Sequence, residues 1–176
     1  MINFKLLKLI TIYLIIIFFS YFSLTQIRYE YYGAKYLKYD IYDPKQVNFV
    51  ALNSNRKELV KRIAIKSFNS KIIDCKQLKS YADNLIKLDN RSSFGYFLNA
   101  VCYEKLKEFN LALESINKSL VFEPYNQDYL VSKAILLISL GNLEESEFIL
   151  KEVLINYPNN GQAISTLKYI MGINNQ

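Results

Sequence analysis

Histidine and tryptophan are both absent from the 176-residue sequence. Without histidine, the chain lacks the commonest general base and the commonest zinc ligand. The sequence also contains no glycine-rich phosphate loop, no cluster of metal ligands and no nucleophile motif. We therefore predict that the protein is not an enzyme and that it uses no cofactor, no metal and no small-molecule substrate.

Cysteine, proline and glycine are scarce, with two, three and five residues respectively. Cys75 and Cys102 form no CxxC pair and cannot supply a disulfide framework, so we interpret both as small, half-buried apolar side chains. The shortage of proline and glycine is unlike a turn-rich β protein or a disordered chain. It favours an all-α fold with long helices.

Charge is distributed unevenly along the chain. Residues 1–71 contain 12 Lys and Arg against 4 Asp and Glu, whereas residues 72–176 contain 10 against 12. A protein that reads nucleic acid usually carries its basic residues on the folded domain. Here residues 72–176, the half expected to be globular, are nearly neutral. We therefore expect no nucleic-acid partner.

The segment from Leu9 to Ile27 is apolar and carries no charge. Lys5 and Lys8 precede it and Arg28 ends it. About 20 apolar residues in a helix cross the hydrocarbon core of a bilayer, and this segment is just long enough. We therefore predict that residues 1–28 are a single-pass transmembrane anchor, and the short basic leader favours a helical domain on the extracytoplasmic side.

The alternative is a signal peptide, whose apolar region is typically about 7–15 residues long and ends in small residues. The best cleavage candidate, Ser23-Leu24-Thr25, is a poor one. Cleavage would leave a secreted, soluble binding module.

Residues 29–55 are predicted to form a tyrosine-rich stalk and linker. Six of the 15 tyrosines lie between residues 29 and 42, and Tyr32, Tyr36 and Tyr39 have the spacing of one helix face. The anchor helix is expected to continue through this stripe and to end at Asp43-Pro44, because the residue before proline is driven out of the helical region.

An internal repeat is the most specific pattern in the sequence, and its period is that of a known helical repeat, about 34 residues. Six positions carry like residues after one period: Ala100 with Ala134, Leu106 with Leu140, Phe109 with Leu143, Ile116 with Leu150, Leu120 with Leu154, and Pro124 with Pro158.

The residues at these spacings resemble the tetratricopeptide repeat, whose pattern is W-x-x-L-G-x-x-Y, A-x-x-x-F and P. The first repeat, 93–126, supplies Tyr96, Ala100, Tyr103, Ala112, Ile116 and Pro124. The second, 127–160, supplies Ala134, Leu137, Leu150 and Pro158 and is looser. The chain departs from the family at Asn99 and Lys133, where leucine is usual. We expect residues 56–176 to form a short solenoid with a degenerate repeat at 59–92 and a capping helix at 161–171.

The resemblance implies that a partner peptide or helix binds in the concave groove formed by the first helix of each repeat. The corresponding residues are Phe94, Phe97, Val101, Asp128, Val131 and Ile135. This face is too apolar for the clamp that some family members use to hold a terminal carboxylate. It either receives an apolar partner segment or is filled by a neighbouring helix of the same chain.

These expectations describe a membrane-anchored scaffold or adaptor for protein–protein interaction. An alternative also follows from resemblance: a transmembrane helix, a tyrosine-rich stalk and a few repeats are similar to the C-terminal tail of some O-antigen ligase-type enzymes. In that case the chain would be an accessory segment in the assembly of cell-envelope polysaccharide.

Overall fold

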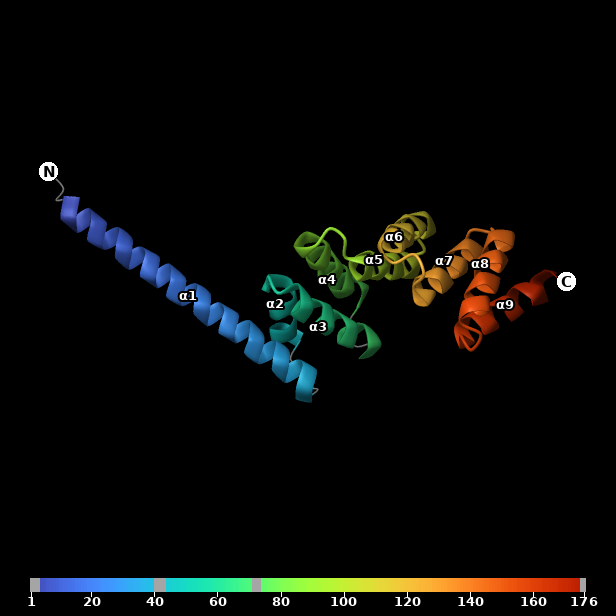
Figure 1. Ribbon diagram of the computed structural model, residues 1–176, viewed down its shortest axis with the longest axis horizontal. Coiled ribbons are helices and arrows are strands. Elements are labelled where there is room, and N and C mark those ends of the chain that lie inside the picture. Colours follow the sequence, from blue (N-terminus) through green and yellow to red (C-terminus); the bar gives the residue numbers. More distant parts are fainter. Residues whose placement is uncertain (1–3, 40–43, 71–73, 175–176) are drawn as a thin grey trace. The chain divides into compact units, whose positions relative to one another are not determined.

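The computed structural model describes residues 4–39, 44–70 and 74–174 (Figure 1). The regular structure of these residues is helical, and no strand occurs among them, as the all-α prediction requires. The helices are α1 (Phe4–Tyr39), α2 (Pro44–Asn53), α3 (Lys57–Ser70), α4 (Cys75–Leu88), α5 (Ser93–Lys105), α6 (Phe109–Phe122), α7 (Gln127–Ser139), α8 (Leu143–Asn156) and α9 (Gly161–Asn174).

The chain divides into two compact units, Met1–Lys66 and Ser67–Gln176. The boundary falls inside α3, whereas the sequence pattern puts the start of the helical domain at residue 56. The division into anchor, stalk and domain remains a prediction.

In the first unit, α1 is one long, continuous helix (Figure 1), and its sequence is largely apolar. Among the described residues it is the one helix with the length and composition to cross a membrane, over Leu7–Lys38. Its large apolar side chains between Leu9 and Phe22 are exposed. A helix that is apolar all round and has no protein cover is typical of a segment that another apolar phase surrounds.

The helix continues past Arg28 to Tyr39, as the tyrosine stripe predicts. Tyr36 is buried, and the Nζ atom of Lys66 in α3 donates hydrogen bonds to the carbonyls of Tyr36 and Leu37, at 2.7 and 3.2 Å. A cation at the last carbonyls satisfies acceptors that the helix itself leaves open. Asp43 and the side chain of Tyr39 lie outside the described residues. Pro44 opens α2, a position where its missing N–H costs nothing.

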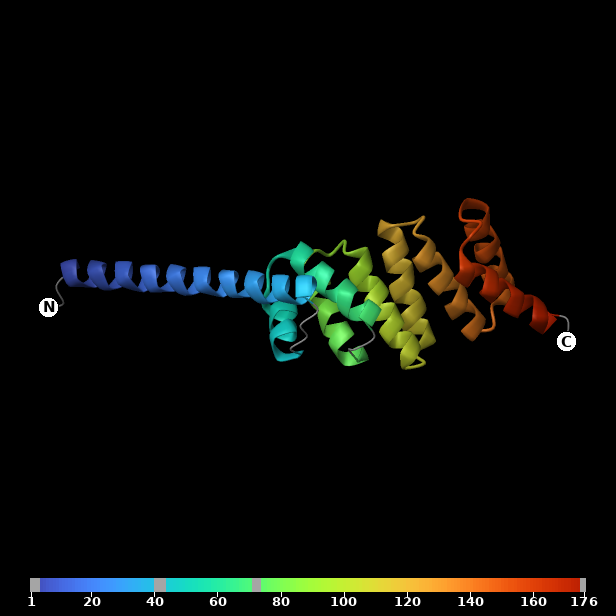
Figure 2. The ribbon, with the colours of Figure 1, turned by 90° about the horizontal axis from the view of Figure 1, so that it is seen from below.

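In the second unit, α4 to α9 follow one another, each packed on the next (Figure 2). The starts of α5, α7 and α9 recur with the period of the sequence repeat. Ser92, Asn126 and Asn160 each accept a hydrogen bond from a backbone N–H in the first turn of α5, α7 and α9. Asp74 caps α4 in the same way, as its position before an apolar pattern predicts.

The repeat extends to the backbone angles. The turn before α6 has φ −86° and ψ 62° at Glu108, and the turn before α8 has −85° and 65° at Asn142. The ends of the same helices agree equally well, with −134° and 73° at Glu123 and −133° and 72° at Tyr157. The two predicted repeats therefore share one backbone conformation at both turns.

Candidate functional site

The positions that define the repeat are mostly interior. Ala100, Ala112, Ile116, Ala134, Leu137 and Leu150 are buried, whereas Tyr96 and Tyr103 are partly covered, and Pro124 and Pro158 lie in the turns with more exposure. The buried alanines allow neighbouring helices to approach closely. This is the packing that the repeat spacing requires.

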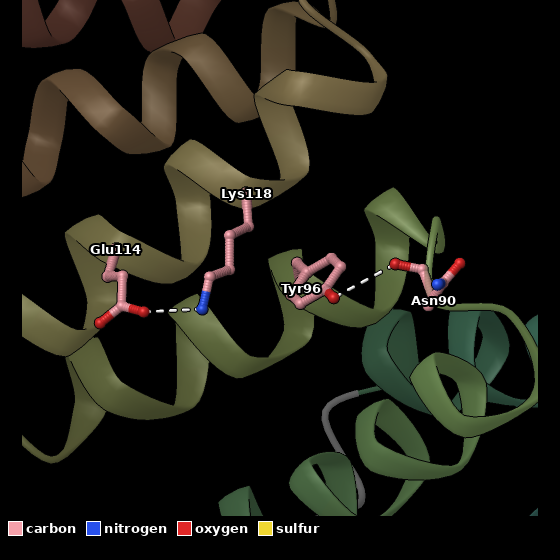
Figure 3. Close-up of polar contacts among 4 residues, drawn as sticks. All are labelled: Asn90, Tyr96, Glu114 and Lys118. Carbon is pink, nitrogen blue, oxygen red and sulfur yellow. Dashed lines mark hydrogen bonds and ion pairs between the residues drawn. The ribbon is translucent and has the colours of Figure 1, made fainter.

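Tyr96 occupies the position where the family pattern has tryptophan, and its ring stacks on Phe122 of α6 at 6.0 Å between centroids. Its hydroxyl donates to the carbonyl of Asn90 in the turn before α5 (Figure 3). On α6, Lys118 points to Glu114 one turn earlier and pairs with it at 2.6 Å (Figure 3). Tyr96 therefore joins the two helices of the first repeat to the turn that precedes them.

The six predicted groove residues form three pairs related by the repeat period, and the pairs lie at different depths. Phe97 and Val131 are 8% and 1% exposed and belong to the interior. Phe94, Val101 and Ile135 are partly exposed, and Asp128 is exposed. Direct contact with a partner is thus open to the outer two pairs and not to the central pair.

Phe97 is the centre of an aromatic cluster. Its ring lies 4.9 Å from Tyr129, 5.7 Å from Phe68 and 6.0 Å from Phe94, measured between centroids. Phe68 lies in the last turn of α3, within the second unit, and its ring covers one side of Phe97. The contacts around Phe97 are thus made by the chain itself, whereas Phe94 and Val101 on the same helix remain partly exposed.

Tyr129 also borders a polar network between the repeats. Ser93 in α5 donates to Glu123, and the side-chain amide of Asn126 donates to the other carboxylate oxygen at 2.8 Å. Burial raises the pKa of Tyr129 to about 12. These side chains bond to one another across α5, the end of α6 and the start of α7, so the network is a joint between the repeats.

A hollow of about 390 Å³ lies between α7 and α9. Its lining is Ile135, Ile138, Ser139, Ser165, Thr166 and Tyr169, a set without a charged side chain. Isoleucine side chains supply an apolar wall, the ring of Tyr169 is exposed, and hydroxyls complete the surface. The hollow can accept an apolar side chain and offers hydrogen bonds to a backbone beside it.

Sequence reasoning found Ile135 and missed the rest of this lining. The sequence does contain a signal for it. Val101, Ile135 and Tyr169 follow one another at the repeat period, and Tyr169 lies in the helix that was interpreted only as a cap. The same step from Ser132 reaches Thr166. The third helix of the series therefore contributes half of the hollow.

In the first repeat, the position equivalent to Ile138 of the hollow carries an acidic side chain. Glu104 is equivalent to Ile138, and its carboxyl is half buried. Burial raises the pKa of Glu104, because desolvation penalises the charged form. The first helices of successive repeats are α5, α7 and α9. They therefore present a carboxylate on α5 and an uncharged hollow between α7 and α9.

No protein-family model and no curated protein matches this chain. Solved structures do. The tetratricopeptide domain of Arabidopsis OM64 matches with a TM-score of 0.58 and 18% identity over 66% of this chain and 97% of that domain. The first such domain of Spaghetti (RPAP3), bound to the HSP90 peptide SRMEEVD, matches with 0.60 and 19% over 72% and 98%. The second such domain of human RPAP3, in complex with the HSP70 peptide SGPTIEEVD, matches with 0.55 and 16% over 70% and 98%. The described fold is thus that of a tetratricopeptide-repeat domain, preceded by an apolar N-terminal helix.

Proposed function

We propose that this chain, with its tetratricopeptide fold, is a membrane-anchored and non-catalytic adaptor that captures a segment of another protein. The observation that carries the proposal is the hollow between α7 and α9, an uncharged site on the series of helices that binds partners in this fold. The similar domains of RPAP3, which hold peptides in their structures, support a peptide or helix as the ligand.

The anchor in this proposal is α1. Its exposed apolar side chains match what a bilayer surrounds, and the span Leu7–Lys38 is long enough to cross the hydrocarbon core with its ends outside. The short leader with Lys5 and Lys8 supports an orientation with the repeats on the extracytoplasmic side.

The chemistry of the hollow supports an apolar anchor residue in the partner. An aliphatic or aromatic side chain between Ile138 and Tyr169 would lose its contact with water. The hydroxyls of Ser165 and Thr166 donate to the carbonyl of Gln162, and their oxygens could accept from a backbone N–H of the partner. The two RPAP3 ligands both end in EEVD. A tail of that kind would bring carboxylates toward Glu104 and Asp128, so the proposed partner segment is apolar and not acidic.

The binding half of the proposal is tested by cross-linking. A photoreactive residue at Ile138 of the full chain, in its own membrane and then in mild detergent, is expected to capture a partner. The same residue at Ile155, which is 77% exposed on α8, is the matched control.

With the photoreactive residue moved to Tyr169, Ile138→Asp should weaken capture by tenfold or more, because a charge would replace an apolar wall. Ile155→Asp should leave it unchanged. Equal capture from both positions, or loss of capture with Ile155→Asp alone, would contradict the groove assignment.

The anchor is tested by extraction. The intact chain should stay with the membrane in carbonate or high salt, and its amino terminus should be that of the full sequence. A mature amino terminus near Gln26 would replace the anchor with a cleaved signal and leave a secreted module. Cross-linking to an enzyme of surface-polysaccharide assembly would identify the accessory role as the adaptor's pathway.

A further inference from the structure

The two cysteines, far apart in sequence, meet at one end of the α4–α5 helix pair. Cys75 is the first residue of α4, and Cys102 lies near the end of α5. The two helices are antiparallel neighbours joined by a short turn, and they lie side by side in both ribbon views (Figures 1 and 2). The first residue of one helix therefore lies opposite the last turn of the other.

The contact between the cysteines is direct. The Sγ atom of Cys102 lies 3.0 Å from the carbonyl oxygen of Cys75, to which its S–H donates. A disulfide needs the two Cβ atoms roughly 3.5–4.5 Å apart, and this hydrogen bond brings the Cys102 sulfur to the residue whose sulfur it would join.

The two thiols differ in access. Cys102 is 1% exposed, whereas Cys75 is partly exposed at the start of its helix. Burial raises the pKa of the Cys102 thiol, which keeps that group protonated and unreactive toward solvent. An external reagent can therefore reach Cys75 first. Cys102 is the resolving cysteine, which reacts with Cys75 in the second step.

We propose that Cys75 and Cys102 form an intramolecular disulfide by exchange with an external disulfide, and that this bond fastens α4 to α5. The thiolate of Cys75 attacks one sulfur of a small-molecule or protein disulfide, whose S–S bond breaks and releases one thiolate. Cys102 loses its proton, attacks the Cys75 sulfur and displaces the second thiol. Two cysteine thiols are oxidised, one external disulfide is reduced to two thiols, and the two protons pass to the leaving sulfurs.

The position of the bond gives it a structural effect. It would close the open end of the helix pair, opposite the turn at residues 89–92. This pair joins the degenerate repeat to the first well-formed repeat, so the bond would hold the start of the solenoid in register. A cross-link spanning this length of chain stabilises mainly by restricting the unfolded state.

The test uses the full chain in mild detergent, equilibrated with mixtures of reduced and oxidised glutathione, quenched with acid, unfolded in denaturant and then labelled with a maleimide of high mass. The reduced chain should take two labels. The oxidised chain should take none while remaining monomeric and free of glutathione, and its proteolytic digest should contain the peptide pair linked through Cys75 and Cys102. The melting temperature should rise by roughly 10 °C on oxidation.

The two single variants are matched controls. Cys102→Ser retains the accessible thiol and should acquire one glutathione. Cys75→Ser retains the buried thiol and should react at least tenfold more slowly in the native state. Neither variant should gain thermal stability on oxidation.

The proposal is overturned if the oxidised wild-type chain keeps two reactive thiols, or carries only glutathione adducts or intermolecular links. It is also overturned if both single variants react equally fast. A chain that forms the bond without any change in melting temperature would overturn the fastening role.

Discussion

The repeats at 93–126 and 127–160 have the same backbone at their turns and different side chains at equivalent positions. Ser92 and Asn126 perform the same capping role, and Ala112 and Ser146 are both buried. In the second repeat the hydroxyl of Ser146 donates to the carbonyl of Ala134 at 2.8 Å. Size is therefore held constant at this position while polarity is free to differ. The comparison separates the features that both repeats need in order to fold, the turn conformation and the side-chain size, from the side-chain chemistry that differs between them.

The largest contrast is between Phe97 and Val131, the buried members of the predicted groove. Phe97→Ala should lower the free energy of unfolding by about 3–5 kcal/mol, because it removes the centre of the cluster with Phe68, Phe94 and Tyr129. Val131→Ala should cost less, about 2 kcal/mol, since fewer buried methyl groups are lost. Denaturant unfolding of each variant measures the difference.

Phe94→Ser is the control. Because Phe94 is partly exposed at the start of its helix, this change should lower the free energy of unfolding less than Phe97→Ala does. A Phe97→Ala variant that keeps its stability and loses only partner capture would contradict the interior assignment. It would return Phe97 to the binding surface.

The second contrast is at Asn99 and Lys133, where the family pattern has leucine. In the described part of the chain the Oδ1 atom of Asn99 is buried without a hydrogen-bond partner. Lys133 reaches Glu145 at 3.3 Å instead. Asn99→Leu should therefore raise the free energy of unfolding by about 1–2 kcal/mol, since it removes an unsatisfied acceptor.

Lys133→Leu should change the stability little, because the surface ion pair it loses contributes about 0–1 kcal/mol. The measurement is the shift in denaturation midpoint of both variants. A lower midpoint for Asn99→Leu would show that this amide makes an interaction in solution that leucine cannot replace.

These contrasts also show what could be read from the sequence. The repeat and the helical extension past Arg28 follow from residue spacing, and the cap at Asp74 follows from its position before an apolar pattern; these signals are local. The division of one apolar stripe into an interior part at Phe97 and a surface part at Ile135 depends on which helix lies beside it. The covering residue, Phe68, belongs to a helix whose pattern is degenerate, and no spacing rule connects it to Phe97.

The contact between Cys75 and Cys102 was missed for a similar reason. Each residue alone fits a small apolar position, and only the pairing of α4 with α5 brings the two residues into contact. Tyr169 was different, since the repeat period already related it to Ile135. It was missed because the last helix was treated as a cap and not as a third copy.

The third contrast concerns pH and the position shared by Gly95 and Tyr129. Burial raises the pKa of Tyr129 to about 12, above the unfolded value of 10.0. The neutral phenol therefore stabilises the fold fully below pH 10, and this contribution is lost as the pH rises toward 12. At pH 11 the wild-type should have lost about 1 kcal/mol relative to its stability at pH 9.

Tyr129→Phe removes the titrating group and should lack this component of the alkaline loss. Urea unfolding of both proteins at pH 9, 10 and 11 gives the comparison. Parallel curves for the two proteins would mean that the phenol is solvated in the native state.

The smallest contrast is at the turn between the two helices of each repeat, where the backbone enters the left-handed region. Gly141 has φ 82° and Lys107, its equivalent, has φ 61°. A side chain in this region costs about 1–2 kcal/mol in steric energy, and glycine escapes the cost. The two repeats thus make the same turn with and without strain.

Gly141→Ala should lower the free energy of unfolding by about 1 kcal/mol, and the loss should come from the backbone alone, because nothing lies within 4 Å of an added Cβ atom. Lys107→Gly should have the opposite sign and a smaller size, about 0.5 kcal/mol, since relief of strain is partly offset by the greater freedom of glycine in the unfolded chain. Lys107→Ala is the control, because it shortens the side chain and keeps the strained conformation. If Lys107→Gly and Lys107→Ala shift the melting temperature equally, the effect belongs to the lysine side chain and not to the turn.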